Sequence, residues 1–211
     1  MKRDLVNLGI LITGGGTGIG KACAAEMYAH GALVTICGRT EEKLEQSVQE
    51  IITNQQDGGA IQYVTCDVTD EDQVLNAVLA ADEFGEGLDG VVANAGGGGA
   101  IVPYHMQAVE EFSRVLNLNV LGTMLCIKHA VPLLRKSDRA SFVGMSSIAS
   151  HLTHLWFGAY PAAKAGIEAI IRNAADEYGP AIYGSMQFAP ALLRLKLWRA
   201  FPEIAKSSTV I

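Results

Sequence analysis

The residues with the clearest chemical potential are Tyr160 and Lys164, which lie four positions apart. Residues at this spacing share one face of a helix, and Pro161 suits a first helical turn. A lysine ammonium beside a phenol favours the phenolate form, so the pair predicts a general acid or base. Ser147 follows an apolar strand pattern thirteen residues before Tyr160 and is a candidate hydrogen-bond donor to a substrate oxygen. Tyr/Lys pairs at helical spacing are also frequent without function, and the rest of the chain must support this interpretation.

A glycine-rich segment, Thr13 to Gly20, provides the second chemical feature. It follows an apolar run and precedes a helical pattern. The start of a helix leaves backbone N–H groups unpaired and carries partial positive charge, and glycine lets the backbone approach a phosphate closely. The segment therefore predicts a phosphate site, built around Gly14, Gly18 and Gly20 and including Thr17 and Ile19.

Two better-known phosphate motifs do not match this segment. The glycine spacing differs from G-x-G-x-x-G. Gly15 to Lys21 comes close to the P-loop of nucleoside triphosphatases, but Ala22 stands where that motif needs Ser or Thr to hold Mg²⁺. Asn94, rather than an acidic residue, closes the fourth strand pattern, so phosphoryl transfer is disfavoured.

Strand and helix patterns alternate along the chain. Strands are expected over residues 8–13, 33–37, 61–66, 88–93 and 141–145, and helices over 18–30, 41–54, 70–82, 107–135 and 160–178. This rhythm with apolar strands predicts an α/β fold whose parallel sheet is covered by helices on both faces. Ligands bind beyond the carboxyl ends of such strands. We therefore expect the glycine segment to share one crevice with Gly38-Arg39, Asp67-Val68 and Asn94-Ala95-Gly96.

The end of the second strand bears on the choice of cofactor. An acidic residue there would bind the ribose 2′-hydroxyl of NAD. Gly38 and Arg39 stand there instead, and a small residue followed by a guanidinium leaves room for a 2′-phosphate and supplies a matching charge. Arg39 therefore favours NADP(H) over NAD(H), with an ordinary exposed loop arginine as the alternative.

Composition indicates a single globular domain over residues 1–211. Hydrophobic residues make up 49% and charged residues 18% of the chain, and the net charge is −6. Without a Lys/Arg cluster, neither nucleic acid nor an anionic membrane surface is expected as a partner. The four cysteines form no C-x-x-C pair, which favours free thiols in a reducing compartment. With no signal-peptide pattern and no apolar run that reads as a bilayer span, the cytoplasm is the expected location.

The ordered motifs together resemble the short-chain dehydrogenase/reductase family. The resemblance runs from about residue 5 to 178 and rests on Thr13-Gly14-x-x-x-Gly18-Ile19-Gly20, Asp67, Asn94-Ala95-Gly96, Asn119, Ser147 and Tyr160-x-x-x-Lys164. It implies a doubly wound Rossmann-type sheet of order 3-2-1-4-5-6, with a seventh strand in complete members. It also implies hydride transfer between a nicotinamide cofactor and a carbonyl or alcohol, in a homodimer or homotetramer.

The resemblance implies a role for each matching residue. Tyr160 would exchange a proton with the substrate oxygen, and Ser147 would hydrogen-bond that oxygen. Lys164 would hold the nicotinamide ribose and tune Tyr160, while Asn119 would position a water that relays protons to Lys164. The remaining cofactor contacts would come from the glycine segment, Arg39, Asp67 and Val68 beside the adenine, and Asn94, Ala95, Gly96 and Pro190.

The C-terminal segment, about 190–211, departs from the family pattern. Pro190 matches, but Ala191 replaces the usual glycine and Leu195 stands where a threonine is expected. The sixth strand is expected over 183–187, and little room follows it for a substrate-covering helix pair and a seventh strand. Either residues of that region are missing from the chain, or this is a shortened member with a weakened nicotinamide pocket. A non-catalytic dinucleotide-binding or scaffold protein is therefore the alternative to an oxidoreductase.

Overall fold

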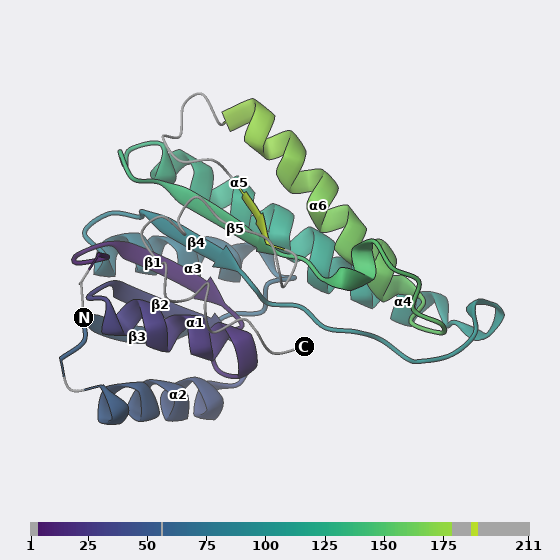
Figure 1. Ribbon diagram of the computed structural model, residues 1–211, viewed down its shortest axis with the longest axis horizontal. Coiled ribbons are helices and arrows are strands. Elements are labelled where there is room, and N and C mark those ends of the chain that lie inside the picture. Colours follow the sequence, from purple (N-terminus) through teal and green to yellow (C-terminus); the bar gives the residue numbers. More distant parts are fainter. Residues whose placement is uncertain (1–3, 56, 179–186, 190–211) are drawn as a thin grey trace.

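A computed structural model describes residues 4–55, 57–178 and 187–189, and its centre is a six-stranded parallel sheet (Figure 1). The strand order is β3-β2-β1-β4-β5-β6, which is the order that the family resemblance implies. The strands are β1 (Gly9–Thr13), β2 (Leu33–Gly38), β3 (Ala60–Thr65), β4 (Gly90–Ala93), β5 (Ser141–Met145) and β6 (Gln187–Ala189). The described ranges contain no seventh strand.

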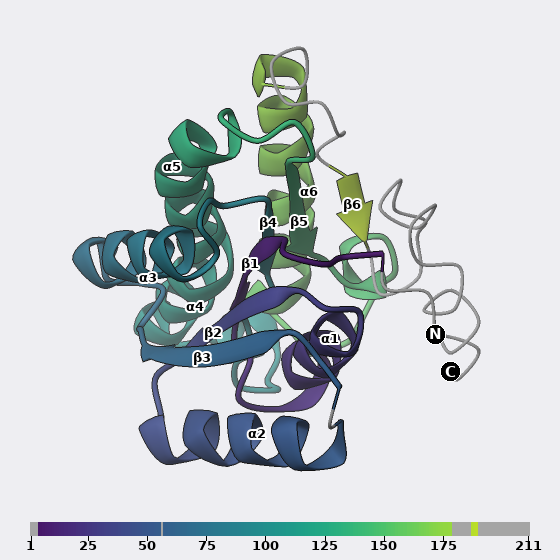
Figure 2. The same ribbon diagram turned by 90° about the vertical axis from the view of Figure 1, so that its left-hand side faces the viewer.

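Helices cover both faces of the sheet, and Figure 2 shows α1 and α3 on opposite sides of it. The helices are α1 (Gly18–Ala29), α2 (Glu41–Asn54), α3 (Glu71–Phe84), α4 (Val109–Leu116), α5 (Gly122–Leu134) and α6 (Ala159–Tyr178). Short turns join them: the 3₁₀ turns η1 (Tyr104–Met106) and η3 (Ile148–Ser150), and the π-helical turn η2 (Asn117–Leu121). Because every crossover joins parallel strands, the carboxyl ends of the strands share one edge of the sheet.

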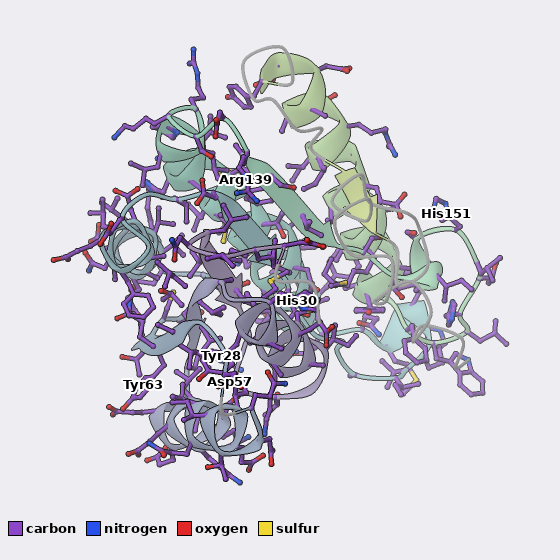
Figure 3. The ribbon with its side chains drawn as sticks, turned by 60° about the vertical axis from the view of Figure 1, so that its left-hand side comes forward. Tyr28, His30, Asp57, Tyr63, Arg139 and His151 are labelled. Atoms are coloured by element: carbon purple, nitrogen blue, oxygen red, sulfur yellow. The ribbon has the colours of Figure 1, made fainter. Side chains whose placement is uncertain are left out.

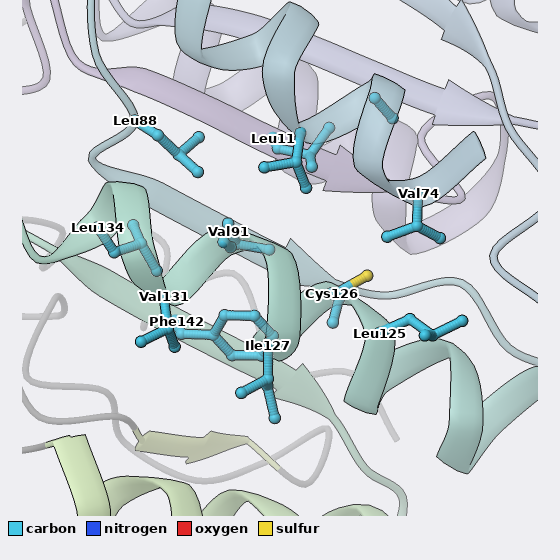
Figure 4. Packing of buried hydrophobic residues seen from close by; sticks show 14 of the residues in the cluster. Leu11, Val74, Leu88, Val91, Leu125, Cys126, Ile127, Val131, Leu134 and Phe142 are labelled. Carbon is cyan, nitrogen blue, oxygen red and sulfur yellow. The ribbon is translucent and has the colours of Figure 1, made fainter. Parts of the chain in front are cut away.

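The core is divided between the two faces of the sheet. On one face Leu11, Val91 and Phe142 pack against α3, α5 and α6 (Figure 4). On the other face Ile12 and Ile36 pack against α1 and α2. Apolar side chains alternate between the faces along each strand, which explains why the strands read as continuous apolar runs. The loops at the carboxyl ends therefore start from a rigid scaffold.

Two regions of local structure bear on the sequence expectations. Among the described residues β6 covers Gln187–Ala189, whose Phe188 and Ala189 pair with Gly144 and Met145 of β5. The sixth strand is expected over 183–187, and residues 183–186 lie outside the described part of the chain, so that part stays a prediction. The helix expected over 107–135 is divided in the structure into α4, η2 and α5. A proline ordinarily interrupts a helix, but α5 continues through Pro132 to Leu134. Asn119 lies in the π-helical turn η2.

The expectation that no segment is long enough to span a bilayer also needs correction. The continuous helical stretch Val109–Leu134 has 26 residues and a mean hydropathy of 1.2 in its most apolar window. Half of that window is buried inside the fold, where α5 packs against α3 and α6. Its place in the core accounts for its apolar composition, so length and hydropathy give only weak support for a membrane span.

Candidate active site

The glycine segment forms a tight turn between β1 and α1 that is joined to the end of β4. Gly14 has a φ of +67°, in the left-handed region that favours glycine. The Asn94 side chain donates from Nδ2 to the carbonyl oxygens of Thr13, at 3.0 Å, and Gly14, at 3.3 Å. The Ala95 amide donates to Thr13 Oγ1 at 2.9 Å. Asn94 and Ala95 therefore shape the glycine turn from the neighbouring strand.

Gly18 and Gly20 serve this turn for different reasons. A Cβ atom on Gly20 would lie 2.3 Å from the Gly14 carbonyl oxygen and 2.6 Å from Asn94 Nδ2. Gly18 has a φ of +56°, and a Cβ there would meet nothing within 4 Å. Gly20 permits the close contact between α1 and the turn because it has no side chain. Gly18 has room for a side chain, and its positive φ is the reason that glycine suits that position.

The start of α1 is suited to an anion. The N-cap residue Thr17 has extended backbone angles and its side chain forms no capping hydrogen bond. The first turn contains no acidic residue, and Ile19 is 56% exposed. Uncapped N–H groups and the partial positive charge of the helix thus face the turn without a competing carboxylate. This donor set fits the phosphates of a dinucleotide.

The ends of β2 and β3 contribute residues of different character. Arg39 is exposed, and within the described chain its guanidinium has no hydrogen-bond or ion-pair partner. The Asp67 carboxylate accepts hydrogen bonds from the Thr69 amide, at 2.9 Å, and the Thr69 hydroxyl, at 2.8 Å. Val68 is buried. Asp67 therefore orders its own loop, and its contact with an adenine stays a prediction.

Asn119 is fully buried in η2 and holds the glycine run that follows β4. Its Nδ2 donates to the carbonyl oxygens of Gly97, at 2.9 Å, and Val115, at 2.8 Å, and its Oδ1 accepts from the Gly97 amide. A Cβ on Gly96 would lie 2.5 Å from Asn119 Oδ1 and 3.2 Å from Lys164 Nζ. Gly96, Asn119 and Lys164 therefore meet at one point. The Asn119 side chain therefore fixes the Gly97 backbone beside the helix, and its role in positioning a water stays a prediction.

Tyr160 and Lys164 lie on α6, as their spacing predicts. Lys164 is 4% exposed, and its Nζ donates to the Met145 carbonyl at 2.9 Å and lies 5.5 Å from the centroid of the Tyr160 ring. Burial lowers the pKa of the Lys164 ammonium to about 8. Tyr160 is half-buried, and its hydroxyl has no hydrogen-bond partner among the described residues. A buried cation thus lies beside a phenol that is available to a ligand.

Ser147 occupies the N-cap of η3, directly after β5. Its Oγ accepts from the Ala149 amide at 3.2 Å, which leaves the hydroxyl proton available for a second group. Ser147 is half-buried, and Lys164 is bonded to the backbone of Met145, two residues earlier. The carboxyl end of β5 thereby joins Ser147 to the helix that carries Tyr160 and Lys164.

Sequence reasoning missed some residues that build this site. Glu168 is buried on α6 and accepts hydrogen bonds from the residues around Ser147. Gln107 donates to the carbonyls of Ala100 and Val102 and so joins two parts of the loop after β4. A charged residue one turn beyond Lys164 was the available signal for Glu168, whereas nothing local marked Gln107. Pro190 and the altered segment after it lie outside the described residues.

The fold and the site define an α/β protein that places a glycine turn and the residues Ser147, Tyr160 and Lys164 at the carboxyl edge of a parallel sheet. Among the described residues, no group of His, Cys, Asp and Glu is arranged to hold a metal ion. The profile of the short chain dehydrogenase family matches residues 9–194. The chain belongs to the short-chain dehydrogenase/reductase family, whose members bind a nicotinamide dinucleotide.

Individual relatives agree with this assignment. The chain is 32% identical over 177 residues to a 2,5-dichloro-2,5-cyclohexadiene-1,4-diol dehydrogenase of Sphingobium indicum, covering 83% of this chain and 68% of that protein. It is 32% identical to a levodione reductase of Leifsonia aquatica, covering 81% of this chain and 63% of that protein. The chain thus spans about two thirds of the length of these curated relatives.

A solved structure shows the same architecture. A short-chain type dehydrogenase/reductase from Mycobacterium ulcerans is 39% identical and superposes with a TM-score of 0.83. The similarity covers 96% of this chain and 74% of that one. Fold and sequence similarity therefore agree on the family and support dehydrogenase or reductase activity.

Proposed function

We propose that the chain is an NADP(H)-dependent oxidoreductase acting on a carbonyl or secondary alcohol of small or medium size. The observation that carries the proposal is the Tyr160–Lys164 pair on α6, whose lysine donates to the Met145 carbonyl at the end of β5, two residues before Ser147. A bound nicotinamide supplies or accepts the hydride in such chemistry. The chain itself must bind the substrate oxygen, move a proton to or from it, and hold the cofactor phosphates.

In the proposed reaction Tyr160 exchanges its hydroxyl proton with the substrate oxygen. Ser147 donates a hydrogen bond to the same oxygen, since the Ala149 amide only donates to Ser147 Oγ and leaves the hydroxyl proton available. The Lys164 ammonium, held in place by the Met145 carbonyl, stabilises negative charge on the phenol. Gly14, Gly18 and Gly20 with the start of α1 hold the dinucleotide phosphates.

The preference for NADP(H) is part of the proposal and rests on Arg39. Its exposed guanidinium, without a partner in the described chain, can pair with a 2′-phosphate beside the small Gly38. A fluorescence titration with NADPH and NADH tests this point. Tighter binding of NADH than of NADPH would show that Arg39 does not set the cofactor preference.

Exposed apolar side chains near the site suggest the kind of substrate. Leu155 and Trp156 follow η3 and are 72% and 59% exposed, and the Trp156 carbonyl accepts from the Val102 amide at 3.0 Å. Tyr104, in η1, donates from its hydroxyl to the Gly158 carbonyl at 3.1 Å. The loops after β4 and β5 thus lie together and present apolar surface, which supports a substrate with an apolar body.

The test of the proposed function is Tyr160→Phe, which removes one hydroxyl. Turnover of any ketone with NADPH should be lost while NADPH binding is retained. Tyr63→Phe is the matched control, because Tyr63 lies on β3, on the opposite part of the sheet (Figure 3). Turnover unchanged in Tyr160→Phe would overturn the assignment of this residue.

A non-catalytic dinucleotide-binding or scaffold protein is the second candidate. Its motivation, the altered segment after Pro190, lies outside the described residues, and steady turnover with NADPH would rule it out. A cytoplasmic location and a homodimer or homotetramer also belong to the proposal. The free cysteines support the former, and light scattering tests the latter.

A further inference from the structure

The carboxylate of Glu168 binds the segment that carries Ser147 from both sides. Its Oε1 accepts from the hydroxyls of Ser146, at 2.7 Å, and Ser150, at 2.5 Å. These two residues flank Ser147 and belong to the end of β5 and to η3. One buried oxygen atom thus closes the turn in which Ser147 lies.

The second carboxylate oxygen reaches further along the same loop. His151 Nε2 lies 3.2 Å from Glu168 Oε2, and the Arg172 guanidinium lies 3.9 Å from it. Figure 3 labels His151 on the loop beside α6. Burial raises the pKa of the Glu168 carboxyl, but hydrogen bonds from Ser150 and Ser146 and the nearby His151 and Arg172 side chains outweigh it and hold the pKa below its ordinary value. Glu168 therefore acts as an ionised acceptor for these groups.

The position of Glu168 on α6 makes these contacts relevant to the chemistry. Tyr160, Lys164 and Glu168 follow one another at four-residue intervals, so they form one stripe on the helix. Lys164 Nζ donates a hydrogen bond to the Met145 carbonyl, and Ser146, the next residue, donates its single hydroxyl proton to Glu168. Lys164 and Glu168 thus both join this stripe of α6 to the segment at the end of β5.

We propose that Glu168 is a positioning residue, which holds η3 so that the Ser147 hydroxyl points at the substrate oxygen. This inference rests on the proposed function for its kinetic readout only. A purely structural role would change stability without a specific link to Ser147. If Glu168 positions Ser147, substituting Glu168 should no longer lower kcat in a variant that lacks the Ser147 hydroxyl.

The kinetic test is a double-substitution cycle with NADPH and a panel of cyclohexanones and aryl ketones. Glu168→Ala should lower kcat by about tenfold or more, because a misplaced donor at the reacting oxygen loses most of its effect. Glu168→Gln keeps an oxygen acceptor at this position, so its kcat should fall less than that of Glu168→Ala. In the Ser147→Ala background, Glu168→Ala should change kcat by no more than about twofold. The NADPH Kd should stay within about twofold throughout.

Glu71→Ala is the matched control, because Glu71 is an exposed α3 glutamate that ion-pairs with Lys128 outside the site. Its kcat should equal that of the unaltered protein. The positioning role would be overturned if Glu168→Ala lowered kcat equally with and without the Ser147 hydroxyl. It would also be overturned if kcat were unchanged in both Glu168→Gln and Glu168→Ala. Glu168→Gln keeps the test informative if Glu168→Ala fails to fold.

Hydrogen exchange provides a readout that needs no turnover. The Ala149 amide donates to Ser147 Oγ and the Ser150 amide to the Ser147 carbonyl, so both report on η3. In Glu168→Ala the exchange of peptides covering 146–152 should accelerate by about tenfold or more, and in Glu168→Gln by less, with peptides of β1 and α1 unchanged. If no ketone is turned over, the proposed function fails, whereas unchanged exchange in 146–152 would overturn the role of Glu168.

Discussion

Gly20→Ala offers a demanding test of the structure, because helix propensity and packing predict effects of opposite sign. Gly20 lies in the first turn of α1, and alanine is better than glycine in a helix by about 1 kcal/mol. The added methyl, however, would lie 2.3 Å from the Gly14 carbonyl oxygen. Ordinary contact begins at 3.4 Å, so backbone would have to move by about 1 Å.

The packing effect should prevail. Overpacking costs about 1–3 kcal/mol, and here it also disturbs the hydrogen bonds of Asn94 to Thr13 and Gly14. We expect a net destabilisation of about 2 kcal/mol, which for a domain of this size lowers Tm by about 4–8 °C. NADPH binding should weaken as well, because the distorted turn is the proposed phosphate site.

Two neighbouring glycines separate the causes. Gly18→Ala meets open space but requires a positive φ, so we expect a cost of about 1–2 kcal/mol from backbone strain alone. Gly16→Ala is the matched control, since its methyl would lie 3.3 Å from the Leu44 side chain and needs little adjustment. Its Tm should change by about 1 °C or less.

Circular dichroism melting and NADPH fluorescence titration measure both effects. The expected order of Tm is unaltered protein, Gly16→Ala, Gly18→Ala and then Gly20→Ala. A Gly20→Ala protein as stable as the unaltered one would refute the close contact between α1 and the glycine turn. A raised Tm would show that helix propensity decides the outcome at this position.

Three further perturbations follow from the site. Arg39→Ala should weaken NADPH binding by about tenfold and leave NADH binding unchanged, because only the 2′-phosphate loses a partner; equal losses for both would contradict the assignment. Asn119→Ala should destabilise the fold by about 2–3 kcal/mol in urea unfolding, since it removes the buried hydrogen bonds of Asn119 to Gly97 and Val115; a loss below about 0.5 kcal/mol would contradict this. The pKa of Lys164 is about 8 in the folded chain and has its ordinary value of 10.5 in the unfolded chain. Between pH 8 and 10.5 the unfolded chain therefore binds more protons than the folded chain. The free energy of unfolding should rise over this range by at most about 3 kcal/mol. Lys164→Met should lack this rise, and identical pH slopes of the two proteins would refute the effect of burial.

The sequence alone determined the succession of strands and helices along the chain, and it supplied the candidate site residues. Continuous apolar runs can be satisfied only by strands covered on both faces, and local glycine and N-cap chemistry marks where helices begin. The Tyr160–Lys164 spacing places both residues on one helix face without knowledge of the rest of the fold. These features depend on neighbours within a few residues, and they are therefore readable from the chain.

The tertiary structure decided how distant residues meet. Asn94 shapes the Gly14 turn from 80 positions away, and Glu168 reaches Ser146 across the join between β5 and α6. No local pattern records such contacts, because they depend on strand order and on the register between β4, β5 and α6. The burial that lowers the Lys164 pKa and the fit of Gly20 against a carbonyl likewise exist only once the chain is packed.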